Sequence, residues 1–175
     1  MKTKKWIGII AAFLFLFSCN EVDKLLDFNI YNQASFTIEG GFPINSPLDI
    51  FSDDITTNSN VAFAGNGTRT DKVKDIKLEE LKLTITNPND KTFAFLKSVH
   101  IYISTNDNDE ILMAYGENIN TSAKSINLLC IPQKLDNYIK ATSYRLRTKV
   151  VTRDSPSEDI TVQVDTRFHV VADPL

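Results

Sequence analysis

Hydrophobic and polar positions alternate with a period of two through most of the chain from residue 76 onward. Residues 81–86 alternate strictly, with leucine or isoleucine at every second position, which predicts a half-buried strand. The apolar positions of residues 76–78 are one step out of phase with that set. We therefore expect one extra residue, a β-bulge, at Glu79 and Glu80.

The same alternation predicts five further strands, over residues 99–103, 111–115, 126–131, 144–151 and 160–170. Residues 153–159 are rich in serine, aspartate and proline, so the last two strands are expected to form a hairpin. Residues 132–141 place Leu135, Tyr138 and Ile139 on one helical face and predict a short helix. Residues 53–60 and 65–71 are expected to be polar loops. Together these elements predict an all-β antiparallel sandwich with one short helix.

The N-terminus has the pattern of a secretory signal. Lys2, Lys4 and Lys5 precede about twelve apolar residues, 6–17. A helix of that length spans about 18 Å, too short to cross the roughly 30 Å core of a bilayer. The run therefore predicts a cleaved leader.

The end of the leader, Leu16-Phe17-Ser18-Cys19, resembles the bacterial lipobox. In that motif an aliphatic residue stands three positions before the cysteine and a small residue directly before it. The resemblance implies cleavage after Ser18, diacylglycerol on the sulfur of Cys19, and a fatty acid such as palmitate on the new amine. Two or more acyl chains anchor a protein stably. An ordinary secretory signal with Cys19 present by chance is the alternative.

These features divide the chain into three predicted parts: a signal peptide (1–18), a lipidated tether (19–34) and a single β-sandwich domain (35–175). The tether is expected to form at most a marginal helical turn. Residues 1–18 carry three lysines and no acid, so cleavage takes the formal net charge from −3 to −6. This acidic balance argues against nucleic acid as a partner, and the lipid on Cys19 is the expected membrane contact.

Asn20, Glu21 and Asp23 lie directly behind the cysteine. Acidic residues there resemble the surface-export signal of Bacteroidota lipoproteins. Most of the chain also resembles small Bacteroidota lipoproteins of unassigned function. The resemblance implies the outer membrane, and leaves open whether the domain faces outward or into the periplasm.

Residues 83–89, a strand followed by Asn87-Pro88-Asn89, are similar to the late embryogenesis abundant type 2, or water-stress, domains. The order of the expected elements extends the similarity over residues 76–172. The resemblance implies an immunoglobulin-like antiparallel β-sandwich and contributes no catalytic residue.

The remaining candidates for chemistry are few. Cys130 lies in the apolar run 126–131 and is expected to be a buried small hydrophobe without a disulfide partner. His100 and His169 fall on the polar sides of strands and are expected to be solvated, with no metal between them. Residues 106–110 (Asn-Asp-Asn-Asp-Glu) are expected to be a hairpin tip. Calcium is the alternative there, although the glycine and distant glutamate of an EF-hand loop are missing.

Basic side chains alternate outward on the last two strands and suggest a stripe across a paired surface. Its members are Arg145, Arg147, Lys149, Arg167 and His169. The stripe is expected to be a solvent face with cross-strand ion pairs. A docking surface for an acidic protein or an anionic glycan is the alternative.

No nucleophile, phosphate-binding or paired-cysteine motif occurs in the sequence, and no cofactor is expected. Glu79 and Glu80 would point to opposite faces of an extended strand. Three functions remain. The first is a non-enzymatic envelope module with an accessory or interaction role. The second is a lipoprotein that binds a glycan or small ligand with loops at one end of the sandwich, and the third is an enzyme whose site is assembled from distant residues.

Overall fold

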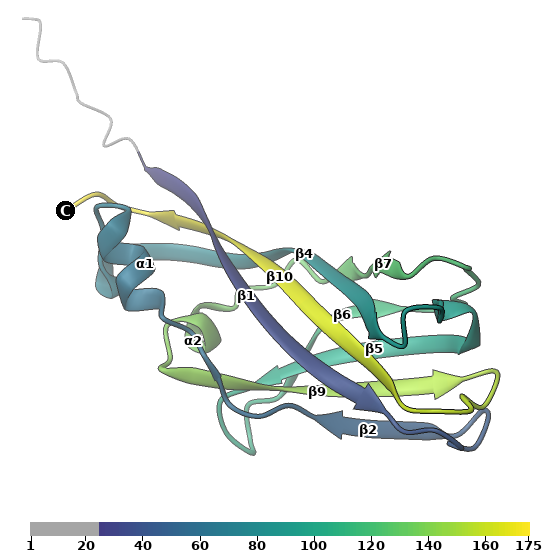
Figure 1. Cartoon of the computed structure of the whole chain (residues 1–175). Helices are drawn as coiled ribbons and strands as arrows, with labels where there is room; N and C mark the ends of the chain where they lie inside the picture. The colour runs from purple at the N-terminus through teal and green to yellow at the C-terminus, as the bar shows by residue number, and fades with distance from the viewer. Residues whose placement is uncertain (1–24) are drawn as a thin grey trace, which may run out of the picture.

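The computed structural model describes residues 25–175 (Figure 1). The predicted signal peptide, Ser18 and Cys19 lie outside this part of the chain. The strands are β1 (Leu26–Ile38), β2 (Pro47–Phe51), β3 (Ile55–Thr56), β4 (Val73–Asn87), β5 (Leu96–Ser104), β6 (Ile111–Gly116), β7 (Ser125–Asn127), β8 (Leu129–Cys130), β9 (Ser143–Thr152) and β10 (Ile160–Ala172). The helices are α1 (Ser59–Gly65) and α2 (Asp136–Ile139), with 3₁₀ turns at Thr70–Lys72 and Phe93–Phe95.

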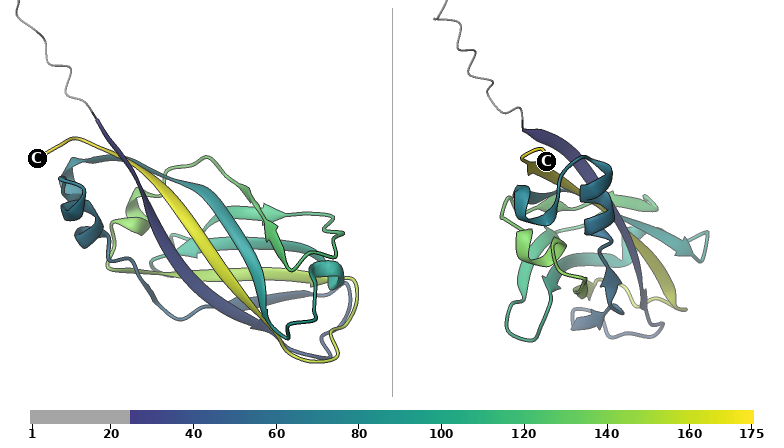
Figure 2. Two further views of the ribbon diagram at one scale, coloured as in Figure 1. Left: turned by 45° about the horizontal axis from the view of Figure 1, so that its top comes forward. Right: turned by 90° about the vertical axis from the view of Figure 1, so that its left-hand side faces the viewer.

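Two antiparallel sheets face each other and confirm the predicted β-sandwich (Figures 1 and 2). One sheet has the order β1-β10-β4-β7, and the other has the order β2-β9-β5-β6-β8, with β3 paired to β9. The core lies between the sheets because alternate side chains of each strand point inward. Val99, Ile101 and Ile103 of β5 are fully buried, as their spacing predicts.

The predicted bulge is present in β4. Glu80 lies opposite Arg167 and Leu78 lies opposite Phe168, so Glu79 is the extra residue. The bulge restores the phase, and the apolar residues before and after it are all buried.

The predicted short helix is α2. No helix is predicted for α1, which overlaps the end of one expected loop (53–60) and the start of the next (65–71). Phe63 of α1 is fully buried and packs edge-on against Phe28 of β1, with ring centroids 6.4 Å apart. Ser59 of α1 donates a hydrogen bond to the carbonyl of Ile139 in α2. Both helices therefore cover the end of the sandwich where β1 begins (Figure 2).

The expected tether boundary is wrong for residues 26–34. These residues belong to β1, which pairs with β10 from Leu26 to Ile38. Their apolar positions have a period of two rather than the helical period. No helix among residues 25–175 is long and apolar enough to cross a membrane.

The expected final hairpin is also wrong. Strand β9 pairs with β2 and β5, whereas β10 pairs with β1 and β4 in the other sheet. Residues 153–159 therefore cross from one sheet to the other. Residues 126–131 likewise form two short strands, with β7 in one sheet and β8 in the other, and Leu128 is buried where the chain crosses.

Candidate functional site

The predicted basic stripe does not form one surface. Arg145, Arg147 and Lys149 lie on the outer side of β9, while Arg167 and His169 lie on the outer side of β10 in the other sheet. The expectation failed because it assumed that β9 and β10 pair. The two groups of basic residues face opposite sides of the sandwich.

Arg147 is held by acids on two neighbouring segments. Its Nη1 lies 2.5 Å from Oδ1 of Asp49 in β2, and its Nη2 and Nε lie 2.6 and 2.9 Å from the carboxylate of Glu110. The guanidinium carbon lies 3.9 Å from the centre of the Tyr102 ring. The hydrogen bonds that Arg147 donates to Glu110, followed by the one it donates to Asp49, outweigh burial and raise the pKa of Arg147 above its usual value. This is a bidentate, stacked arginine with a fixed position.

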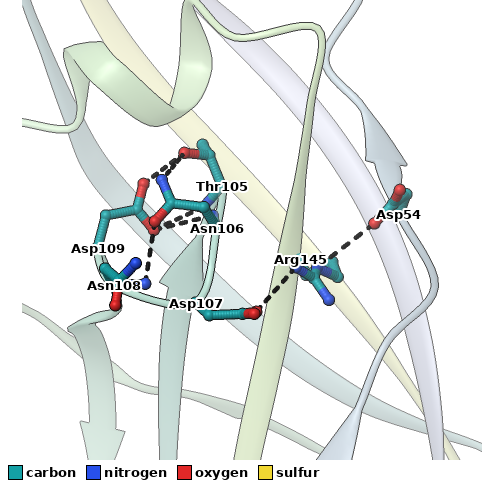
Figure 3. Close-up of polar contacts among 7 residues, drawn as sticks. All are labelled: Asp54, Thr105, Asn106, Asp107, Asn108, Asp109 and Arg145. Atoms are coloured by element: carbon teal, nitrogen blue, oxygen red, sulfur yellow. Dashed lines mark hydrogen bonds and ion pairs between the residues drawn. The ribbon is translucent and has the colours of Figure 1, made fainter.

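Arg145 is held less firmly, between two acids on different loops (Figure 3). Its Nε lies 3.6 Å from Asp54 and its Nη2 lies 3.5 Å from Asp107, and 46% of its side chain is exposed. The longer distances and greater exposure make these ion pairs weaker than those of Arg147.

Residues 105–110 form the tip of the β5–β6 hairpin, and Asp109 holds the turn together (Figure 3). Its carboxylate accepts hydrogen bonds from the backbone N–H groups of Thr105 (2.9 Å) and Asn106 (3.1 Å) and from the Thr105 hydroxyl. Burial opposes ionisation of Asp109, but the hydrogen bonds outweigh it and lower its pKa. Both carboxylate oxygens therefore have a structural role. Within residues 25–175, no group of three or more His, Cys, Asp or Glu side chains is arranged to hold a metal ion.

The structure brings two of the sequence candidates together. A cavity of about 290 Å³ is lined by residues of both the β9 arginines and the hairpin tip, including Arg145, Arg147, Asp107 and Glu110. Phe51, which is 69% exposed, adds an aromatic surface. We call this the arginine site. Its cations already have carboxylate partners, so a ligand must compete with Asp49, Asp54, Asp107 and Glu110.

A second, larger cavity lies at the other end of the sandwich and contains no residue that the sequence singled out. Its volume is about 480 Å³, and we call it the asparagine cavity. The lining residues are Asn45, Lys97, Asn118, Asn120 and Arg153. They come from the β1–β2 connection, the start of β5, the segment after β6 and the residue that follows β9. No local pattern in the sequence links these positions.

The remaining candidates have structural partners. Arg167 lies 3.3 Å from Glu79 and 3.0 Å from Glu80, because the bulge turns both carboxylates to one face and not to opposite faces as expected. Nε2 of His100 lies 3.0 Å from the carboxylate of Glu117. Nδ1 of His169 lies 3.3 Å from the carboxylate of Asp27.

Cys130 is a free thiol that packs against the core and is partly buried. Burial raises its pKa above the usual value. This environment disfavours the reactive thiolate, in agreement with the predicted role of a small hydrophobe.

No protein-family model matches the chain, and no curated protein matches it. Solved structures that are similar include the decameric BFDV capsid protein, with 10% identity and a TM-score of 0.42, where the match covers 85% of this chain and 99% of that one. The capsid structure of Desmodium yellow mottle tymovirus has 13% identity and a TM-score of 0.27, covering 85% and 90%. Turnip yellow mosaic virus has 17% identity and a TM-score of 0.28, covering 85% and 94%. Likenesses this distant carry no argument about the function of this chain.

Proposed function

We propose that this chain is a lipid-anchored, non-enzymatic lipoprotein of the outer membrane, whose sandwich acts as an accessory or interaction module. The observation that carries the proposal is the sequence Leu16-Phe17-Ser18-Cys19 behind a basic, then apolar, leader. Its resemblance to the lipobox supports lipidation of Cys19.

The position of the first strand supports a short connection to the bilayer. Six residues, 20–25, separate Cys19 from the start of β1 at Leu26. The seven Cα–Cα steps from Cys19 to Leu26 reach at most about 25 Å when extended. A lipid on Cys19 would therefore keep the sandwich next to the membrane surface, with the β1 start nearest to it.

Lipidation is tested by metabolic labelling with an alkyne fatty acid in a bacterial host that processes lipoproteins. The chain contains two cysteines, Cys19 and Cys130, which provide a matched pair of variants. We expect Cys19→Ser to abolish the label and Cys130→Ser to retain it. Label that persists in Cys19→Ser, or an intact leader in the mass spectrum of the wild-type chain, would refute the proposal.

Exposed aromatic side chains support an interaction role. Tyr31 on β1 and Phe51 on β2 are each 69% exposed, and large aromatic residues are enriched at protein interfaces. A photo-crosslinking phenylalanine analogue at either position is expected to capture a recurrent envelope protein in native membranes. The same analogue at the exposed Thr37 is the control. Identical crosslinks from all three positions, or none from any, would count against an interaction module.

A second candidate function is the binding of a glycan or another small ligand. The asparagine cavity favours it, because polar loop residues converge there at one end of the sandwich. This candidate is compatible with the lipid anchor and does not depend on it.

A further inference from the structure

We infer that the asparagine cavity binds an acidic saccharide, a sugar unit that carries a carboxylate. The inference rests on the second candidate function, ligand binding, and does not require the lipid anchor at Cys19. The cavity supplies two cations for the carboxylate and three side-chain amides for the sugar hydroxyls.

The two cations of the cavity differ from the arginines elsewhere on the surface. Among residues 25–175, neither Lys97 nor Arg153 has a carboxylate within 4.0 Å, whereas Arg145, Arg147 and Arg167 each lie beside two. A negatively charged ligand would therefore meet cations that have no competing acid. Charge-assisted hydrogen bonds that such cations donate to a carboxylate are stronger than hydrogen bonds between neutral groups.

Neutral oxygen atoms hold both cations in place. Nζ of Lys97 donates to Oδ1 of Asn45 at 2.9 Å, and Arg153 donates to the backbone carbonyls of Leu96 and Ile119. An ammonium group has three donors and a guanidinium has five. These contacts use one donor of Lys97 and two of Arg153, so donors remain for a ligand.

The backbone of the cavity is also unusual. Asn45 and Asn118 have φ angles of 54° and 50°, and they are two of the three non-glycine residues with positive φ within residues 25–175. Asparagine adopts this left-handed conformation more readily than other residues outside glycine, so both turns suit their sequence. Backbone hydrogen bonds from Asn45 to Thr152 (2.9 Å) and from Ile119 to Lys97 (3.0 Å) tie these loops to β9 and β5. The cavity is thus preformed by the two strands that support it.

The amides select a sugar over a simple anion. Each asparagine amide has both donors and an acceptor, which matches the dual character of a sugar hydroxyl. A fully ionised inorganic anion accepts hydrogen bonds but donates none, so it would leave the amide oxygens of Asn118 and Asn120 without a ligand donor, whereas a sugar hydroxyl can donate to them. The cavity volume of about 480 Å³ falls within the range of small-ligand pockets, about 300–1,000 Å³.

The inference is tested by isothermal titration of the full chain in detergent with two uronate trimers, trigalacturonate and trimannuronate. We expect at least one to bind with a submillimolar Kd. Its methyl ester, which has the same sugar without the charge, and acetate, which has the charge without the sugar, are each expected to bind at least about tenfold more weakly.

Variants assign the binding to the cavity. Lys97→Met is expected to weaken binding about tenfold or more, and Asn120→Ala about fivefold. Lys124→Met, at an exposed lysine that does not line the cavity, is the matched control and should leave the Kd unchanged. Circular dichroism checks that all three variants fold.

Three results would overturn the inference: no binding of either trimer at millimolar concentration, equal binding of acid and ester, or an unchanged Kd in Lys97→Met. The Cys19→Ser chain should bind as the wild type does. Failure of the lipid anchor and failure of the cavity are therefore separate outcomes.

Discussion

Arg147 illustrates how one side chain joins three segments of a sheet surface. Its fork contacts Glu110 on one side and Asp49 on the other, and its plane lies over Tyr102. Lysine would keep the charge but lose the bidentate and stacking geometry. We expect Arg147→Lys to lower the free energy of unfolding by about 1 kcal/mol, measured by urea denaturation. The more exposed Arg145→Lys should cost less than about 0.5 kcal/mol, and equal losses would contradict this ranking.

The lowered pKa of Asp109 predicts how the stability of the chain depends on pH. Its pKa in the folded chain is lowered below 3.8, so the ionised form favours folding. This contribution is fully present above the unfolded pKa and is lost as the pH falls through the lower folded value. We therefore expect the stability of the wild type to fall more steeply below about pH 4 than that of Asp109→Asn. Urea denaturation across this range measures both slopes. Thr105→Val, which removes one donor to Asp109, should give an intermediate slope, and identical slopes would refute the assignment.

The environment of Cys130 predicts that its thiol is alkylated slowly in the folded chain. Since burial raises its pKa and limits access, iodoacetamide should modify it at least about tenfold more slowly in the folded chain than in guanidinium. Mass spectrometry of the Cys19→Ser variant follows this single thiol. Equal rates in both conditions would mean that the thiol is exposed.

At the level of elements, the alternation of apolar residues along one segment predicts whether that segment is a strand or helix and which of its faces is buried. The inward side of β5, the bulge at Glu79, the helix α2 and the strands after residue 76 follow from the spacing of their own side chains, except that residues 126–131 form two strands and not one. Strand pairing depends on segments far apart in the chain. Nothing between residues 144 and 170 indicates that β9 and β10 enter different sheets.

The sequence does not predict strand β1, because the alternation of its apolar residues is interrupted. Apolar residues occupy every second position from Leu26 to Ile38 except at Asn32, which takes an inward position. Nδ2 of Asn32 donates to the hydroxyl of Tyr144 at 3.1 Å, and the backbone carbonyl of Asn32 accepts a hydrogen bond from the hydroxyl of Thr166. These partners lie more than 110 residues away, so only the folded chain explains the polar residue.

The arginine site and the asparagine cavity also depend on contacts between segments that are far apart in the sequence. The sequence identified Arg145, Arg147 and the loop 106–110 as separate candidates, and folding placed them in one site. The asparagine cavity is assembled from four distant segments whose members are ordinary surface residues in isolation. Its chemistry comes from their convergence, which no local pattern records.

The bulge allows a sharp test of the register of β4. Deleting Glu79 removes the extra residue and leaves Leu78 and Leu81 facing the core. We expect this deletion to cost less than about 2 kcal/mol, including the lost contact with Arg167. Deleting Lys82 instead puts Leu81 and Leu83 on opposite faces, because a shift of one residue inverts every side chain.

The Lys82 deletion should cost more than about 3 kcal/mol, since at least one core leucine is exposed and the phase of the strand is lost. Thermal and urea unfolding of both deletion variants give the comparison. If the Glu79 deletion were as damaging as the Lys82 deletion, the bulge would not be a simple insertion in this strand.

The whole molecule has two chemically different ends. Exposed aliphatic side chains are more numerous where the described chain begins, with Leu25 before β1, Val61 on α1 and Leu175 after β10, than near the asparagine cavity, where Ile44 is 53% exposed. Figure 2 shows the C-terminus beside α1, and the N–H of Leu175 donates to the carbonyl of Gly67 at 3.0 Å. The asparagine cavity lies at the opposite end. A lipid on Cys19 would thus place the apolar end against the bilayer and turn the cavity away from it.

This orientation is measurable because the only tryptophan, Trp6, lies in the predicted leader. A mature chain with Val61→Trp therefore carries a single fluorophore at the apolar end, and Ile44→Trp carries one in an exposed loop at the cavity end. On proteoliposomes we expect Val61→Trp to emit at shorter wavelength and to be quenched by brominated lipid, because its indole enters the interface. Ile44→Trp should show neither effect, and Val61→Trp combined with Cys19→Ser should lose both. Equal quenching at the two positions would mean that the lipid tethers the sandwich without orienting it, and the cavity would then have no preferred direction from the membrane.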